Sequence, residues 1–270
     1  MPFITIFETM ETVKPEVLQA LILTKNEDPN LKRVLDNLIW LDKVVILDSF
    51  STDETLNIAE AYSNVEVHQR VFDTHAKQWN YGLGLITSVW VLSLDSDYVL
   101  PEDFVAETLQ IISKPEKSAY EAGFEFLVFG QRLKRNNTQP RPVLFKLSDC
   151  VYFDDGHTQR LKINGETGSY KSLIWHDDRK SLTRWLSNQS GYSLKECDML
   201  LAADNSKLGL NSKIRKTKIF APFLVFFYCL FIKGLIFKGW AGWHYTLQRT
   251  MVEMLLALRL IEAEKLSKSV

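Results

Sequence analysis

Two acidic side chains, Asp95 and Asp97, follow the apolar run Val89–Leu94, which is typical of a buried strand. Carboxylates two positions apart in a turn can bind one divalent cation through oxygen and leave coordination positions for phosphate oxygens. A solvated turn in which one Asp caps the next helix is the alternative interpretation. Because the run is the fourth of its kind in an alternating series of strands and helices, we expect the pair to be functional.

Two further polar clusters follow earlier apolar runs. Thr24, Asn26 and Glu27 come at the end of the first run and offer donors and acceptors to a base or a ribose. Asp48 ends the second run, where its carboxylate could accept from a base N–H or a ribose hydroxyl, or could simply form a turn with Ser49. Neither cluster contains the glycine pattern of a dinucleotide-binding site or a P-loop.

These clusters need a scaffold that brings them together. Apolar runs predict strands at residues 17–24, 43–47, 65–71 and 89–94, and helical spacing predicts helices at 30–41, 53–62, 75–86 and 101–112. This order predicts an α/β fold in which a parallel sheet is covered by helices on both faces. The polar clusters then meet at the carboxyl edge of the sheet, where α/β folds bind ligands. Further along, we expect a strand at 123–129, loops through most of 131–180 and a helix at 182–203.

Composition excludes several classes of protein. The chain has 270 residues, of which 46% are hydrophobic and 24% charged, so a disordered or collagen-like chain is excluded. The three cysteines, Cys150, Cys197 and Cys229, form no CxxC pair. A zinc site built on thiolates is therefore not expected, and we predict reduced thiols in a cytosolic compartment.

The C-terminal part of the chain differs in charge from the rest. Residues 205–252 contain eight basic residues and no acidic residue, whereas residues 1–204 are acidic overall. The uncharged stretch Ile219–Ile232 has 14 residues and contains Pro222, whereas a spanning helix needs about 20. We therefore predict an apolar helical segment at the surface of a membrane, with a dimer interface as the alternative. Nucleic acid is not an expected partner, because the aromatic residues form one apolar block and do not alternate with the charges.

Three strings of residues resemble a known family. Leu23–Glu27, Val45–Thr55 and Leu94–Asp97 resemble the family 2 glycosyltransferases of GT-A fold, in the variety found in bacterial lipopolysaccharide core and capsule synthesis. The resemblance extends over about residues 17–200, and the string around Asp48 is its most specific part. The segment that contains Pro222 and Gly239 is similar to the membrane-associated end of that subgroup.

The resemblance implies a nucleotide-sugar donor, UDP-linked by default, and Mg²⁺ or Mn²⁺. It implies that Thr24, Asn26 and Glu27 line the nucleotide pocket, that Asp48 contacts the base or ribose, and that Asp95 contacts the donor. Lys77 would approach the diphosphate. Asp97 would bind the metal, with Asp95 and His176 as further candidate ligands. His176 could equally be a structural hydrogen-bonding residue, and Arg179 could neutralise phosphate.

Members of the family generally invert the anomeric centre, which calls for a carboxylate base. We assign this role to Asp155, because Gly156 allows a turn and His157 could orient the carboxylate. Asp154 and Asp177 are the alternatives, as is a solvated acidic loop without a catalytic role. The related subgroup often has Glu directly after the His, whereas Thr158 follows His157 here.

Together these observations predict a membrane-associated, metal-dependent inverting glycosyltransferase. It would act at the cytoplasmic face of the inner membrane on a hydroxyl of a glycolipid or lipid-linked glycan, in lipopolysaccharide or other surface polysaccharide synthesis. We expect a nucleotide-sugar half at 1–115, an acceptor half at 116–204 and a membrane-associated tail at 205–270. A metal-dependent nucleotidyltransferase, a catalytically silent membrane scaffold and a transferase with a polyprenyl-phosphate acceptor are the alternatives.

Overall fold

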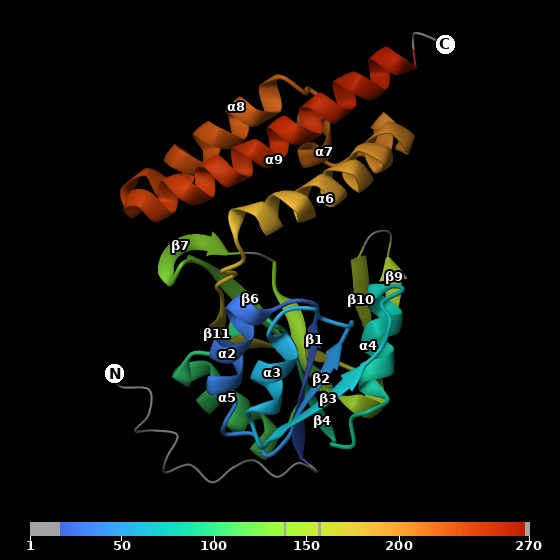
Figure 1. Cartoon of the computed structure of the whole chain (residues 1–270), viewed down its shortest axis with the longest axis vertical. Helices are drawn as coiled ribbons and strands as arrows, with labels where there is room; N and C mark the ends of the chain where they lie inside the picture. Colours follow the sequence, from blue (N-terminus) through green and yellow to red (C-terminus); the bar gives the residue numbers. More distant parts are fainter. Residues whose placement is uncertain (1–16, 138, 156–157, 268–270) are drawn as a thin grey trace. The chain divides into compact units, whose positions relative to one another are not determined.

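The computed structural model describes residues 17–137, 139–155 and 158–267, with side chains except those of residues 134–137, 155, 158 and 207 (Figure 1). The chain divides into two compact units. The first, which we call the sheet unit, runs to Leu127 and resumes at Asn137–Arg179. The second, the helical unit, comprises Val128–Asn136 and Lys180–Val270.

The first half of the sheet unit alternates strands and helices, as predicted. Its strands lie in the order β3-β2-β1-β4 and are all parallel. The elements are β1 (Leu18–Thr24), α2 (Asp28–Asp36), β2 (Val44–Asp48), α3 (Thr55–Glu60), β3 (Val65–Gln69), α4 (His75–Leu83) and β4 (Trp90–Asp95). Their register places Thr24 beside Asp48 and Leu23 beside Asp95. The three polar clusters therefore share one edge of the sheet.

The helix predicted at 30–41 is shorter than expected. It ends at Asp36 because the next turn is tighter: the Asn37 N–H donates to the Val34 carbonyl at 3.1 Å and the Leu38 N–H to the Leu35 carbonyl at 2.9 Å. Leu38 and Leu41, whose spacing suggested a longer helix, are nevertheless fully buried. Leu38 and Leu41 thus belong to a turn that packs on the core, and their apolar spacing resembled a continuation of the helix.

The second half of the sheet unit corrects the prediction of loops at 131–180. Strands fill most of this region, and the sheet continues from β4 in the order β8-β6-β11-β5. The elements are β5 (Tyr98–Val99), α5 (Glu102–Ser113), β6 (Ala119–Val128), β7 (Gln131–Asn137), β8 (Arg141–Lys146), η1 (Leu147–Asp149), β9 (Cys150–Asp155), β10 (Thr158–Ile163) and β11 (Thr167–His176). In β11 the buried residues alternate as Tyr170, Ser172 and Ile174, a weak pattern because one of the three is polar.

The four strands predicted to be parallel are parallel, but the later strands make the whole sheet mixed. β8 runs antiparallel to both β4 and β6, and β5 runs antiparallel to β11. Both faces of the sheet are covered, as predicted. In β1, Ala20 and Ile22 face the core formed with α2, α3 and α5, whereas Leu21 faces α4 and β9. Trp79 of α4 stacks on Tyr152 of β9 with ring centroids 5.3 Å apart.

A carboxylate on α5 holds the irregular part of β11, where the register shifts between Ser169 and Leu173. Glu107 accepts from the backbone N–H of Lys171 and of Ser172, both at 2.9 Å, and from the Ser172 hydroxyl at 2.6 Å. Partial burial opposes ionisation of Glu107, but these hydrogen bonds outweigh it and hold its pKa below 4.5. The ionised form of Glu107 therefore stabilises the fold.

We expect Glu107→Gln to lower the free energy of unfolding by about 1–2 kcal/mol at pH 7, because an amide is a weaker acceptor than a carboxylate. Because the folded pKa is depressed, this contribution is fully present above pH 4.5 and is lost as the pH falls through the folded pKa. Urea unfolding at several pH values measures the difference. If the difference in free energy of unfolding between the wild type and Glu107→Gln stayed constant down to pH 3, about one unit below the usual carboxyl range, the prediction would be wrong.

The helical unit is built around a long C-terminal helix. Its elements include α6 (Leu182–Ala202), η2 (Asn205–Lys207), α7 (Leu210–Arg215), α8 (Phe220–Phe227), η3 (Tyr228–Ile232), η4 (Leu235–Lys238) and α9 (Gly239–Leu266). Cys197 and Leu200 of α6 pack on Leu256 and Leu260 of α9. Thus α6 lies in this unit, although the sequence grouped it with the acceptor half. By length and hydropathy, none of the helices described here suffices alone to cross a membrane, and only Phe220–Ile232 and Leu235–Leu266 taken together, bent by 68°, meet those criteria.

Ion pairs inside the helical unit engage basic residues of the tail, Arg215 and Lys218 among them. Arg215 lies 3.1 Å from the buried carboxylate of Glu253 and 2.8 Å from that of Glu196. Lys218 pairs with Glu264. Arg249 also lies 3.8 Å from Glu253. These three cations are therefore partly neutralised within the fold, and more of the positive charge of the tail rests on its other basic residues.

Candidate active site

Asp48 lies at the carboxyl end of β2 and is completely buried. It accepts hydrogen bonds from the Thr24 hydroxyl at 2.9 Å, the Ser51 N–H at 2.8 Å, the Ser51 hydroxyl at 2.5 Å and the Gln69 amide at 3.2 Å. A carboxylate has about four acceptor positions, so these donors occupy its capacity. Asp48 thus fixes the loop after β2, and its direct contact with a base or ribose stays a prediction that would require one donor to be displaced.

Asn26 and Glu27 join the loops that follow β1 and β2. Asn26 has a φ of 56°, a left-handed conformation that Asn tolerates better than most residues. Its N–H donates to the Ser51 hydroxyl at 2.6 Å, and its side-chain oxygen accepts from the Thr52 N–H at 2.7 Å. The Glu27 N–H donates to the Thr55 hydroxyl at 2.6 Å. The structure therefore brings the predicted nucleotide-pocket residues together, in loops held rigid by one another.

Asp95 and Asp97 lie immediately beside these loops. Asp95, the last residue of β4, is exposed, whereas Asp97 is 9% exposed. Although Asp95 is exposed as a residue, protein atoms lie densely around its carboxylate. This loss of surrounding water, together with the nearby Asp97 carboxylate, raises the pKa of Asp95. A hydrogen bond from the Tyr98 hydroxyl partly offsets this effect. Two neighbouring carboxylates of this kind form a site of excess negative charge that a cation would balance.

His176 reaches this site through the short ladder between β11 and β5. The ladder pairs His176 with Tyr98, and the Asp177 N–H donates to the Asp97 carbonyl at 3.1 Å. His176 Nε2 lies 3.1 Å from Asp97 Oδ2, and its ring packs against Tyr98 and Phe126. Burial lowers the pKa of His176, but the carboxylates of Asp97, Asp95 and Asp178 together raise it more, so the pKa lies above its ordinary value. His176 therefore positions Asp97, and its role as a metal ligand stays a prediction.

A divalent cation would find two carboxylates here and no complete protein cage. Among the residues that the structure describes, no group of three or more His, Cys, Asp and Glu side chains is arranged to hold a metal ion. Mg²⁺ in phosphate-handling sites is typically held by one or two carboxylates, with substrate phosphates and water completing its coordination. Asp95 and Asp97 fit that arrangement.

Asn30, which the sequence did not single out, is the buried centre of a hydrogen-bond network. It is 0% exposed. Its amide donates to Glu27 Oε2 at 3.0 Å and to Asp178 Oδ1 at 2.9 Å, and its oxygen accepts from the Arg179 N–H at 2.9 Å and from Arg33 at 3.1 Å. All four hydrogen-bonding positions of the side chain are thus used. The sequence could have indicated this role, because Asn30 stands four positions before Val34 and therefore lies on the buried face of α2, where a polar residue is unusual.

Asp177 and Arg179 form a structural ion pair. Asp177 is 2% exposed, and its Oδ2 accepts from Arg179 Nε at 2.9 Å and Nη2 at 2.7 Å. The Asp177 carbonyl also accepts from Arg33 at 2.7 Å. Because the Asp177 carboxylate is buried and already engaged by the Arg179 guanidinium, the geometry disfavours Asp177 as the base. The predicted contact of Arg179 with phosphate would compete with this pair.

The other candidates for the base lie on β9. Asp154 is exposed, and its Oδ2 accepts from the Thr74 hydroxyl, at the N-cap of α4, at 3.2 Å. Asp155 belongs to β9 by its backbone, but its side chain lies outside the described residues, as do Gly156 and His157. Lys77, on the same α4, is exposed, with its Nζ 3.6 Å from Asp73. The roles of Asp154, Asp155 and Lys77 stay predictions.

The family-2 glycosyl transferase sequence model matches residues 20–178, which contain every site residue discussed above except Arg179. The chain belongs to glycosyl transferase family 2. The match covers more than half of the chain and ends where the sheet unit ends. The family thus accounts for the sheet unit and leaves the helical unit unassigned.

Relatives with curated names resemble only part of the chain. An uncharacterized glycosyltransferase of Rickettsia bellii is 27% identical over 133 residues, 49% of this chain and 44% of the relative. A second, from Rickettsia conorii, is 29% identical over 127 residues, 47% of this chain and 44% of the relative. The match thus spans less than half the length of either relative.

Among solved structures, S. aureus TarS 1-349 in complex with UDP-GlcNAc is 16% identical to this chain. The alignment has a TM-score of 0.48 and covers 78% of this chain and 72% of that one. Glucosyl-3-phosphoglycerate synthase from Mycobacterium tuberculosis, in complex with Mn²⁺, UDP and glucosyl-3-phosphoglycerate, is 20% identical with a TM-score of 0.33, covering 45% of this chain and 47% of that one. We draw no conclusion about this chain from similarities of that size.

Proposed function

We propose that the protein is an inverting, metal-dependent glycosyltransferase that moves a sugar from a nucleotide-sugar donor to a hydroxyl of a glycolipid or lipid-linked glycan. The observation that supports this most strongly is the Asp95–Asp97 pair, placed by β4 directly beside the polar loops that follow β1 and β2. Family membership supports transfer of a sugar. A role in lipopolysaccharide or other cell-surface polysaccharide synthesis is our extension of the resemblance in sequence.

In this proposal the donor diphosphate lies at the acidic pair. Asp97, with Asp95, would hold Mg²⁺ or Mn²⁺, which supplies positive charge against the departing nucleoside diphosphate. His176 keeps the Asp97 carboxylate in place through its ring nitrogen, 3.1 Å away. Asp48 and Asn26 hold the loops against which the nucleoside, UDP by default, would rest. Rigid loops of this kind favour transfer because the reacting groups are positioned before the reaction begins.

The acceptor hydroxyl requires a base, and we propose Asp155, with Asp154 as the alternative. The hairpin β9–β10 that carries both residues is anchored to the site. The Tyr152 hydroxyl lies 2.9 Å from the Ser93 hydroxyl, two residues before Asp95. The Asn80 amide of α4 donates to the Tyr152 carbonyl at 2.8 Å. The hairpin is thus held beside β4. A carboxylate of β9 could therefore accept a proton from a substrate bound at the carboxyl end of β4.

We further propose that the helical unit attaches the protein to the cytoplasmic face of the inner membrane, through residues 205–250. Large apolar side chains are exposed along α8, η3, η4 and the start of α9; they include Phe220, Phe223, Phe231, Ile232, Phe237 and Trp240. Exposed apolar surface of this extent on one unit indicates an interaction site. Basic residues such as Lys213 and Lys238 in the same stretch favour an anionic surface.

The nucleotide part of the proposal is tested by thermal stability in the presence of UDP, GDP, CDP and their sugar conjugates, each with and without Mn²⁺. A ligand that binds only the folded state stabilises it by about 2.7 kcal/mol at a concentration of about 100 times its Kd. We expect one diphosphate and its sugar conjugate to raise the melting temperature, and only with metal present.

Other outcomes would identify the alternatives. Stabilisation by a nucleoside triphosphate, with release of pyrophosphate, would favour a nucleotidyltransferase. A protein that is folded but stabilised by none of these ligands would favour a membrane scaffold without catalysis. Activity that survives loss of both Asp154 and Asp155 would favour a phosphate acceptor, which needs no strong base.

A further inference from the structure

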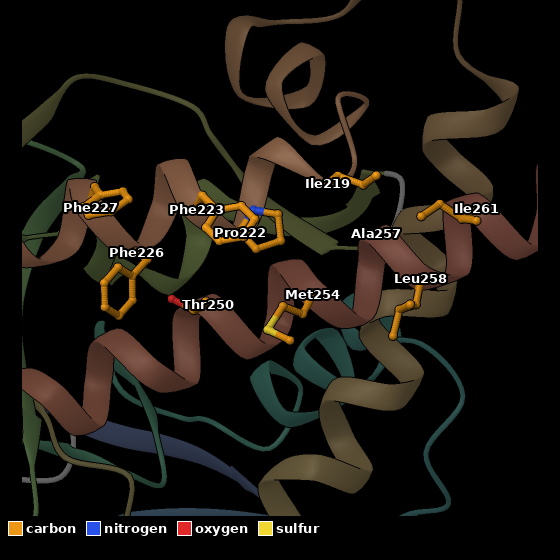
Figure 2. Close-up of a pocket in the computed structure, with 10 residues that line it drawn as sticks. All are labelled: Ile219, Pro222, Phe223, Phe226, Phe227, Thr250, Met254, Ala257, Leu258 and Ile261. Carbon is orange, nitrogen blue, oxygen red and sulfur yellow. The ribbon is translucent and has the colours of Figure 1, made fainter.

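A pocket of about 530 Å³ lies between α8 and α9, wholly inside the helical unit (Figure 2). Its volume is in the range of small-molecule sites, roughly 300–1,000 Å³. The side chains that line it include Phe223, Phe226 and Phe227 of α8 and Met254, Leu258 and Ile261 of α9. The pocket lies far along the chain from the carboxylates of the acidic pair and belongs to the other unit.

The pocket presents no polar group that is available to a ligand. Thr250 is the one lining residue with a polar side chain, and its hydroxyl donates to the Thr246 carbonyl of the same helix at 2.9 Å. A sugar, a nucleotide or an ordered water would find no hydrogen-bond partner on these walls and would lose those it makes in solution. The occupant must therefore be hydrocarbon over the whole length that enters.

The shape of the pocket suits an extended chain. Figure 2 shows the lining residues of α9 in a row, from Thr250 to Ile261, with those of α8 opposite. Eleven helical steps of about 1.5 Å give the row a length of about 16 Å. One leaflet of a bilayer is about 15 Å deep, half of a hydrocarbon core of about 30 Å. The pocket thus has the length of a single lipid chain.

Positive charge lies next to one end of this row. Arg249 directly precedes Thr250, and Lys233 follows the α8–η3 segment. Burial lowers the pKa of Lys233, and the neighbouring Arg249 lowers it further, although the Cys229 thiol opposes this. Arg249 lies 3.8 Å from the Glu253 carboxylate, but Arg215 engages the same carboxylate at 3.1 Å, so Arg249 and Lys233 together still favour a further anion beside them. At the opposite end, Lys218 next to Ile219 is already paired with Glu264.

We propose that the pocket between α8 and α9 binds one hydrocarbon chain of an anionic lipid, with the acidic head of that lipid at Lys233 and Arg249. This inference deepens the membrane part of the proposed function and rests on it for the source of the lipid. It is separate from sugar transfer, because binding of the chain requires neither a donor nor the acidic pair.

The test uses the full chain, held in a steroid detergent that lacks a flexible chain, and the fluorescent fatty acid cis-parinaric acid as the probe. Dodecyl phosphate and dodecanol compete for the probe. Met254→Gln places an amide in the pocket, whereas Leu247→Gln makes a comparable change on the same exposed face of α9, two turns away and outside the pocket. Lys233→Gln tests the head of the lipid, and circular dichroism verifies that each variant is folded.

We expect saturable binding of one probe per chain, weakened roughly tenfold or more by Met254→Gln and changed by less than about twofold by Leu247→Gln. Dodecyl phosphate should compete better than dodecanol, and Lys233→Gln should remove that preference. Equal effects of the two Gln variants on α9, or binding that does not saturate, would overturn the proposal. So would a wild-type dimer in light scattering that Met254→Gln dissociates, because a second copy would then cover the pocket. None of these readouts depends on sugar transfer.

Discussion

Asp97→Asn is expected to reduce sugar transfer at saturating Mn²⁺ by roughly 10³-fold or more, equivalent to about 4 kcal/mol of transition-state stabilisation. The amide keeps the shape of the side chain and can still accept from His176, but it removes one of the two charges that would hold the cation. The metal-dependent stabilisation by nucleoside diphosphate should disappear with it. Initial rates of nucleoside diphosphate release measure the effect.

The same substitution should leave the melting temperature of the ligand-free protein unchanged or raise it. Asp95 and Asp97 repel each other, as the raised pKa of Asp95 reflects, and removing one charge relieves that repulsion. Asp36→Asn is the matched control. It makes the same change at an exposed carboxylate paired with Lys32, where an ion pair contributes little, and should leave transfer intact. Full activity of Asp97→Asn would refute the proposed mechanism.

Asn30→Leu is expected to lower the free energy of unfolding by about 3–5 kcal/mol. The two side chains are similar in size, so the loss comes from hydrogen bonds and not from a cavity. Glu27 and Asp178 lose their donor, and Arg33 and the Arg179 N–H lose their acceptor. Because these partners join the loop after β1 to the segment after β11, transfer activity should fall even below the melting temperature. Urea unfolding and single-temperature rates measure the two effects.

Asn57→Leu provides the control for that prediction. Asn57 of α3 also donates to a glutamate three residues earlier, Glu54, at 2.7 Å, but both side chains are exposed. Water can replace the lost bond there, so we expect a change within about 0.5 kcal/mol. Equal losses of stability in the two variants would mean that the Asn30 network adds nothing beyond a single local hydrogen bond.

Local patterns predicted the first half of the sheet unit correctly. Four apolar runs separated by helical spacing require only near neighbours in sequence to be recognised, and the parallel order of β1 to β4 follows from the crossover connections. Those patterns failed at 131–180, where the short apolar run of β8 stands between Arg141 and Lys146 and where β11 contains Thr, Ser and Lys among its apolar residues. A strand of mixed composition becomes recognisable only beside the neighbours that bury its inner face.

The sequence by itself determined which residues could do chemistry: the polar strings that end β1, β2 and β4, and the separation of an acidic body from a basic, apolar tail. Only the tertiary structure decided which of them meet. It brought His176 to Asp97 across 79 residues and Asn30 to Arg179 across 149. It also formed an open pocket between α8 and α9. The physical reason is that turn chemistry and hydrophobic period act within a few residues, whereas side-chain pairing depends on how the strands are ordered in the sheet.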